Sequence, residues 1–282
     1  SRHPGPQHRS NQIMAEEAQK GHNVGRLKGG DPVVFGRGGE ELEHLARQGV
    51  DFREIPGVTS AIAAAAYGGI PVTHRDYASS LHIVTGHARE GAELDIDFEA
   101  LVRTGGTLLF LMGVTALPVI AEGLLEAGMD PDTPAAMVER GTLPGQRRCS
   151  ATLGTLRSRA EEMEIHSPAL IIVGGVCALA EALCWFERLP LHGKRLLVTR
   201  PKGRAGTLSE KLRALGADAV EFPCIRTEAI SPCPAMEAAL DQLTEYEWLG
   251  FTSAAGVDAF WTCLRDMGKD ARALGGVKLA AI

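Results

Sequence analysis

Short apolar runs alternate with amphipathic stretches along most of the chain. The runs are rich in Val, Ile, Leu or Phe and are short enough for buried strands. They predict strands at Val24–Leu27, Phe52–Ile55, His82–Thr85, Thr107–Met112, Ala135–Glu139 and Ala169–Val173. The amphipathic stretches predict helices at Asn11–Lys20, Glu40–Gln48, Thr59–Tyr67, Phe98–Arg103, Leu117–Ala127, Leu156–Met163 and Cys177–Glu187. This alternation of strands and helices indicates an α/β fold.

Pro190 and Gly193 interrupt this pattern and predict a linker at residues 188–195, between a domain of residues 1–187 and a second of residues 196–282. The second part again alternates. It predicts strands at Leu196–Arg200, Ala219–Phe222, Trp248–Thr252 and Val277–Ile282, and helices at Thr207–Leu215 and Ser253–Leu264. Because the last strand ends with the sequence, we expect this domain to be cut short.

Composition removes several classes of function. The chain has 282 residues, a formal net charge of −6 and a pI of about 5.9, which disfavours nucleic acid as a partner. It has neither an apolar stretch long enough for a membrane span nor the apolar core of a signal peptide, so we expect a cytoplasmic protein with no membrane partner. The six cysteines form no C-x-x-C pair, so we expect reduced thiols and no metal site.

The stretch RLKGGDPVVFGRGGEE, residues 26–41, is the first candidate for a ligand site. Gly29 and Gly30 directly follow a predicted strand, where α/β proteins hold ligands, and glycine lets the backbone approach a ligand closely. Pro32 restricts the backbone of Asp31 to extended angles. A plain tight turn without a ligand explains the same residues equally well. A P-loop does not, because no G-K-[ST] follows.

Further motifs join this loop in a resemblance to a known family. They are REIPGVTSAIAAAAYGGIPVTHRDYASSLHIVTGH, LLFLMG, MVERGTLPGQRR and SPALIIVGGV, with WFE behind the last. From Pro6 to Phe186 the chain resembles the uroporphyrinogen-III C-methyltransferases of the tetrapyrrole methylase family. The resemblance implies two α/β subdomains, a homodimer, and methyl transfer from S-adenosyl-L-methionine to uroporphyrinogen III. The product would be precorrin-2, formed by way of precorrin-1, in siroheme or cobalamin biosynthesis.

The resemblance also implies the residues of the site. Its cofactor-binding positions fall on Gly29, Gly30, Asp31, Val34, Thr59, Ser60, Met112 and Gly141. In such a set the glycines admit the ligand, Asp31 accepts hydrogen bonds from it, and Val34 and Met112 offer apolar surface to an adenine. For a substrate with many carboxylates we expect Arg37, His74 and Arg75 to bind. Arg147 and Arg148 are expected to be solvated loop charges.

One departure from the family concerns the start of the chain. The family's first glycine turn, its Y-D motif and a G-K-R lysine precede the part that this sequence matches. The resemblance therefore places the family's acid and base positions upstream of Ser1, where this sequence begins. We expect the start to be missing and name no catalytic acid or base.

A second departure concerns the end of the chain. The stretch HGKRLLVTRPKGRAGTLSEKLRALGADAVEFPCIRTEAI, with YEWLGFTSAAGVDAFW, resembles the opening of uroporphyrinogen-III synthase. We expect this second activity to be incomplete. A non-catalytic fragment that binds tetrapyrrole or S-adenosylmethionine, and a phosphate-binding loop, are the alternatives.

Overall fold

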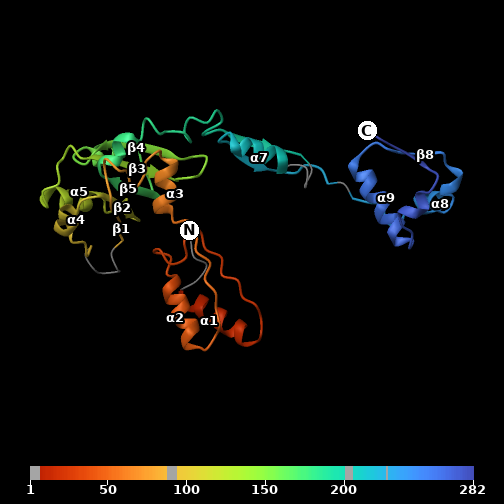
Figure 1. Ribbon diagram of the computed structural model, residues 1–282, viewed down its shortest axis with the longest axis horizontal. Helices are drawn as coiled ribbons and strands as arrows, with labels where there is room; N and C mark the ends of the chain where they lie inside the picture. Colours follow the sequence, from red (N-terminus) through yellow and green to blue (C-terminus); the bar gives the residue numbers. More distant parts are fainter. Residues whose placement is uncertain (1–6, 88–93, 201–205, 227) are drawn as a thin grey trace. The chain divides into compact units, whose positions relative to one another are not determined.

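The computed structural model describes residues 7–87, 94–200, 206–226 and 228–282 (Figure 1). The chain divides into two compact units. Residues 1–196 with 211–219 form the N-terminal unit, and residues 197–210 with 220–282 form the C-terminal unit. None of the described helices is long and apolar enough to cross a membrane.

The first six residues of the predicted methylase domain lie outside the described part of the chain. They include Ser1, upstream of which the resemblance places the family's acid and base positions. The structure does not test where those positions lie, and their placement stays a prediction.

A five-stranded sheet organises the N-terminal unit. Its strand order is β1-β2-β5-β3-β4, in which β1 and β2 are parallel and every other neighbouring pair is antiparallel. The strands are β1 (Leu81–Thr85), β2 (Thr107–Leu111), β3 (Pro134–Glu139), β4 (Arg147–Thr152) and β5 (Ala169–Val173). Because β2 and β3 are both antiparallel to β5, they run in the same direction as each other. The carboxyl ends of β1, β2 and β3 therefore lie at one edge of the sheet.

Apolar side chains cover both faces of this sheet. Successive residues of β2 alternate between two buried clusters, as strand geometry requires: Leu108 and Phe110 lie in one and Leu109 in the other. The first cluster includes residues of α4 (Phe98–Thr104), α5 (Leu117–Glu126) and α6 (Leu156–Glu162). The second includes residues of α3 (Ser60–Tyr67) and of the 3-10 helix η1 (Gly175–Leu179). Helix α3 thus rests on the sheet through its small residues.

Two further helices precede the sheet. Figure 1 shows α1 (Gln7–Gln19) and α2 (Gly38–Arg47) side by side. Between and after them, residues 22–37 and 50–59 form no helix or strand. The strands predicted at Val24–Leu27 and Phe52–Ile55 are therefore wrong.

Both failed strand predictions have the same physical reason. A strand needs a neighbour for its backbone N–H and C=O groups, and within the described residues no strand pairs with either segment. Their apolar side chains stay in solvent: Leu27 is 92% exposed and Ile55 is 78% exposed. An apolar run in the sequence reports hydrophobicity but not the presence of a partner.

Two other predictions also need correction. The helix predicted at Cys177–Glu187 is replaced by η1 and turns, after which Phe186 packs edge-on against Tyr67. Strand β4 was not predicted, because its sequence RRCSAT lacks a clear apolar alternation. It forms through six paired positions with β3, and it buries Cys149 completely.

The C-terminal unit is smaller. Its core consists of Leu240, Leu243, Phe260 and Leu264. Its elements are α8 (Pro234–Asp241), η2 (Leu243–Glu245), β8 (Trp248–Phe251), α9 (Ala254–Asp266), η3 (Ala271–Leu274) and β9 (Lys278–Ala281), with β8 and β9 parallel. The division between the units runs through β6 (Arg195–Val198), α7 (Gly206–Ala214) and β7 (Asp218–Glu221). The strands and helices that the sequence predicts between residues 196 and 282 are confirmed, whereas α8, η2 and η3 were not predicted.

Candidate functional site

The glycine loop, defined as residues 29–37, touches residues 57–60 at the start of α3 backbone to backbone. Gly30 has φ +79°, a left-handed conformation that favours glycine, and a Cβ atom there would lie 3.4 Å from the carbonyl oxygen of Val58. A Cβ atom on Gly57 would lie 2.2 Å from the carbonyl oxygen of Gly30, which is closer than atoms can approach. Glycine at both positions therefore lets residues 29–31 pack against residues 57–60. Sequence reasoning did not single out Gly57.

Asp31 ties these two segments together. Its Oδ1 accepts hydrogen bonds from the backbone N–H groups of Val33 and Val34, each at 3.0 Å, and its Oδ2 accepts from Gly57 N–H at 3.1 Å. The N–H groups of Val34, Val33 and Gly57, in that order, lower the pKa of the carboxyl group. Asp31 is thus an ionised residue whose hydrogen bonds join the two segments. A carboxylate has about four lone-pair sites, so it still has capacity for a ligand donor.

Helix α3 begins next to this tie. Thr59 is its N-cap residue, and the Thr59 hydroxyl accepts a hydrogen bond from Ala61 N–H at 3.4 Å. Ser60 is the first helical residue and is exposed. The unpaired N–H groups and the dipole of a helix start favour a negatively charged ligand group. The structure therefore brings together Gly29, Gly30, Asp31, Val34, Thr59 and Ser60 of the predicted cofactor set.

The two remaining cofactor candidates follow strands at the shared carboxyl edge of the sheet. Met112 follows β2, has φ 56° and is 50% exposed, so its side chain is open to a ligand. Gly141 follows β3, and a Cβ atom there would lie 2.4 Å from the Cβ of Ala64 in α3. Gly141 therefore lets this edge approach the helix that Thr59 caps. Non-glycine residues with positive φ, here Met112 with Arg140 and Thr142, gather at ligand-binding sites in many proteins.

The substrate candidates lie in two places. Arg37 is the N-cap residue of α2 in a left-handed conformation, and it pairs with Glu40 at 2.6 Å. His74 and Arg75 belong to the turn before β1, where His74 Nδ1 accepts a hydrogen bond from Asp76 N–H. Among the described residues, no hydrogen bond or ion pair joins Arg37 to this turn. All three side chains retain access to solvent.

The two arginines expected to be solvated are held by the protein instead. The Arg148 side chain is only 8% exposed and donates hydrogen bonds to the carbonyl oxygens of Gly68 and Ala180. Arg147 pairs with Glu139. The expectation of solvated loop charges is wrong for Arg148, because this side chain satisfies the carbonyl groups of Gly68 at the end of α3 and of Ala180 at the end of η1.

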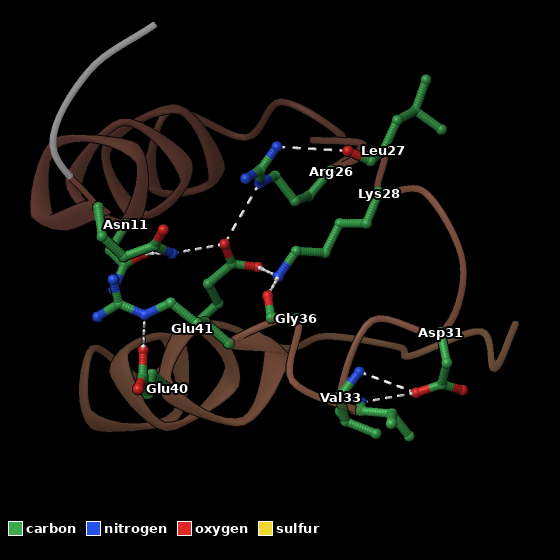
Figure 2. A network of polar contacts seen from close by, with 12 residues as sticks. Asn11, Arg26, Leu27, Lys28, Asp31, Val33, Gly36, Glu40 and Glu41 are labelled. Atoms are coloured by element: carbon green, nitrogen blue, oxygen red, sulfur yellow. Dashed lines mark hydrogen bonds and ion pairs between the residues drawn. The ribbon is translucent and has the colours of Figure 1, made fainter. Parts of the chain in front are cut away.

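Glu41 is a buried carboxylate that pairs with Lys28, the residue before the glycine loop. The sequence analysis did not single it out. The side chain of Glu41 in α2 is 6% exposed and lies between Arg26 and Lys28 (Figure 2). Lys28 Nζ donates to Glu41 Oε2 at 2.7 Å, and it also donates to the carbonyl oxygen of Gly36. Charged residues of this kind resemble a solvated helix face in sequence, so only the fold reveals the contact.

No metal centre stands out within the described ranges. They contain no group of three or more His, Cys, Asp or Glu side chains that could hold a metal ion. All six cysteines are free thiols, and burial raises the pKa of Cys177 to about 12, which makes it unreactive at neutral pH.

The C-terminal unit has a groove of its own. It has a volume of about 970 Å³ and is lined in part by α9. Ser253 lies at this groove, but its hydroxyl accepts a hydrogen bond from Gly256 N–H at 3.1 Å and caps the helix. Ser253 is therefore a helix cap in this structure.

Comparisons with known proteins identify the same families as the motifs. Residues 1–157 match the family Tetrapyrrole (Corrin/Porphyrin) Methylases, and residues 206–282 match Uroporphyrinogen-III synthase HemD. The porphyrin biosynthesis protein HemD of Ruminiclostridium josui is 52% identical over 99% of this chain and 56% of its own length. The siroheme synthase of Pseudomonas paraeruginosa is 49% identical over 66% of this chain and 40% of its own length. The chain thus spans about half the length of the curated relatives it matches.

A solved structure is also similar. The uroporphyrin-III C-methyltransferase of Thermus thermophilus, complexed with S-adenosyl homocysteine, is 39% identical with a TM-score of 0.54, and the match covers 61% of this chain and 75% of that one. The family match covers more than half of the chain, including the glycine loop, the start of α3 and the sheet edge. This chain belongs to the tetrapyrrole methylase family.

Proposed function

We propose that this chain binds S-adenosylmethionine and C-methylates uroporphyrinogen III to precorrin-2 by way of precorrin-1. One observation carries the proposal: Asp31 holds the glycine loop against the start of α3, so that six residues of the family's cofactor set lie together. The similarity to siroheme synthases and to a uroporphyrin-III C-methyltransferase supports the same reaction.

The residues present fit this cofactor. A Cβ atom on Gly29 would have no heavy atom within 4 Å, so the backbone there is open to a ligand. Val34 is partly exposed and Met112 is 50% exposed, and both offer apolar surface for an adenine. Gly29, Gly30, Asp31 and the start of α3 would hold the polar parts. When bound, the sulfonium of S-adenosylmethionine supplies the methyl group.

The chain's own contribution is mainly binding and orientation. Methyl transfer requires the donor, the methyl group and the attacking carbon to be in line, and the loop conformation held by Asp31 favours that alignment. Arg37, His74 and Arg75 are accessible to solvent and supply donors for the carboxylates of the substrate. We assign no residue of this chain to removal of the ring proton.

A second candidate function is binding without turnover. Two measurements on the whole chain separate it from catalysis. Calorimetry with S-adenosylhomocysteine tests the cofactor site, and mass spectrometry after incubation with S-adenosylmethionine and uroporphyrinogen III tests methylation. We expect binding in the first and a dimethylated tetrapyrrole in the second. Binding without a methylated product would favour the non-catalytic function, and absence of binding would contradict both.

A further inference from the structure

Glu41 is buried in a way that is unusual for a carboxylate. Its side chain is 6% exposed, and burial of a charge is unfavourable unless partners compensate for it. Three side chains do so: Gln7 Nε2 donates to Oε1 at 2.6 Å, Arg26 Nε lies 3.4 Å from Oε1, and Lys28 Nζ donates to Oε2 at 2.7 Å. Burial raises the pKa of Glu41, but the Lys28 and Gln7 hydrogen bonds and the charges of Lys28 and Arg26 outweigh it, so the net shift is downward.

Lys28 connects this carboxylate to the glycine loop. Its side chain is 13% exposed, and its ammonium group also donates to the carbonyl oxygen of Gly36. Lys28 directly precedes Gly29, whereas Gly36 lies at the far end of the loop. One ammonium group therefore bridges both ends of the segment that contains Gly29, Gly30, Asp31 and Val34.

The loop needs such a bridge because its far end is tightly wound. Cβ atoms on Gly36 and Gly38 would lie 2.5 Å and 2.4 Å from the carbonyl oxygen of Pro32. Phe35 and Arg37 have φ values of 53° and 60°, which are unfavourable for residues with side chains. Polar contacts at the ends of the loop must hold this conformation in place, since the loop has little apolar packing.

We propose that Glu41 is a positioning residue: its carboxylate fixes the Lys28 ammonium group, which bridges the two ends of the glycine loop and holds it in the conformation that binds the cofactor. The inference rests on the proposed function, because it assigns the loop to S-adenosylmethionine. Glu41 acts through Lys28 and does not itself contact the ligand.

The test compares the full chain with Glu41→Gln, Lys28→Met, the double variant and Glu43→Gln. Glu43 lies on the same helix but is exposed and pairs with Arg47, so it is a matched control. Calorimetry with S-adenosylhomocysteine measures affinity, and circular dichroism confirms that each variant is folded. We expect Glu41→Gln and Lys28→Met each to weaken binding about tenfold, as the loss of a charged hydrogen bond implies. Glu43→Gln should bind like the unmodified chain.

The double variant separates positioning from a general loss of stability. If Glu41 acts through Lys28, the double variant binds no more weakly than the weaker single variant. Unchanged affinity in Glu41→Gln, or additive effects of the two substitutions, would overturn the inference. If Glu41→Gln does not fold, Lys28→Met alone decides, because it also removes the bridge.

Hydrogen exchange without ligand keeps the test independent of the proposed function. The N–H groups of Val33 and Val34 bond to Asp31, and we expect them to lose protection in Glu41→Gln but not in Glu43→Gln. Failure of the unmodified chain to bind S-adenosylhomocysteine would contradict the proposed function alone. Unchanged protection of these two amides would contradict the role of Glu41.

Discussion

The two sides of the candidate site are built differently. The sheet edge with Met112 and Gly141 ends a sheet whose two faces are covered by apolar side chains, and Leu108, Leu109 and Phe110 of β2 are fully buried. The glycine loop has no such support and is held by backbone contacts at glycine and by charged side chains. The difference shows that the sheet supplies most of the free energy of folding. The loop contributes little to stability but presents its backbone in the shape that a ligand requires.

This contrast has a consequence for motion. Segments with few buried apolar contacts open locally at a lower free energy than the core does. The loop side therefore opens while the sheet remains folded. Substitutions in the sheet should change the free energy of unfolding, and substitutions in the loop should change ligand affinity at nearly constant stability.

The largest effect is expected in the sheet. Phe110→Ala removes a fully buried aromatic ring and should lower the free energy of unfolding by about 3–5 kcal/mol. Urea denaturation followed by circular dichroism measures it. Leu27→Ala is the matched control, since Leu27 is 92% exposed, and it should stay within about 0.5 kcal/mol. Equal losses in both variants would remove the contrast between the two sides.

The second effect lies at the contact between the loop and α3. In Gly57→Ala the new Cβ would lie 2.2 Å from the carbonyl oxygen of Gly30, so the backbone must shift. We expect the binding free energy for S-adenosylhomocysteine to fall by about 1–3 kcal/mol, the usual size of an overpacking effect. Calorimetry measures this, and urea denaturation should show the sheet unchanged. Gly25→Ala is a useful control, because a Cβ atom there meets nothing within 4 Å and its φ lies outside the left-handed range.

A somewhat smaller effect is expected for Gly30→Val. The contact of its Cβ with Val58 O would be 3.4 Å, which is tolerable, but φ +79° is unfavourable for a β-branched residue. The strain is about 1–2 kcal/mol, and it should appear as weaker binding of S-adenosylhomocysteine. Affinity equal to that of the unmodified chain would show that Gly30 does not belong to the cofactor loop.

The smallest effect is a pH dependence. Folding lowers the pKa of Asp31 below its ordinary value of 3.8. The stabilisation from the hydrogen bonds to its carboxylate is therefore fully present above pH 3.8 and is lost as the pH falls through the lowered pKa. Hydrogen exchange at the Gly57 amide should accelerate in that acid range relative to a sheet amide. Asp31→Asn should abolish this acid step, and an unchanged acid step in the variant would assign it to another group.

The sequence predicts the two sides unequally well. Strands β1, β2, β3 and β5 follow from their apolar runs, because these runs also find partners in the fold. The run at Val24–Leu27 has the same character but no neighbouring strand within the described residues, and no local pattern reports that. Strand β4 escapes prediction because its pairing with β3, rather than its own hydrophobicity, makes it a strand.

The candidate site shows the same limit. Gly30 and Asp31 stand out because a left-handed glycine and an acceptor for N–H groups have local signatures. Gly57 and Glu41 contact residues that are not their neighbours in sequence, Gly30 and Lys28. The local sequence around Gly57 and Glu41 gives no sign of these contacts. Glu41 and Glu43 are indistinguishable by residue type, although one is buried and the other is exposed.

The most direct test of the central claim is hydrogen exchange of the whole chain with and without S-adenosylhomocysteine. We predict that the ligand protects residues 29–34 and 59–60, at the glycine loop and the start of α3, and leaves α9 in the C-terminal unit unchanged. Absence of protection in those two segments, or protection confined to residues 206–282, would contradict the assignment of the cofactor site.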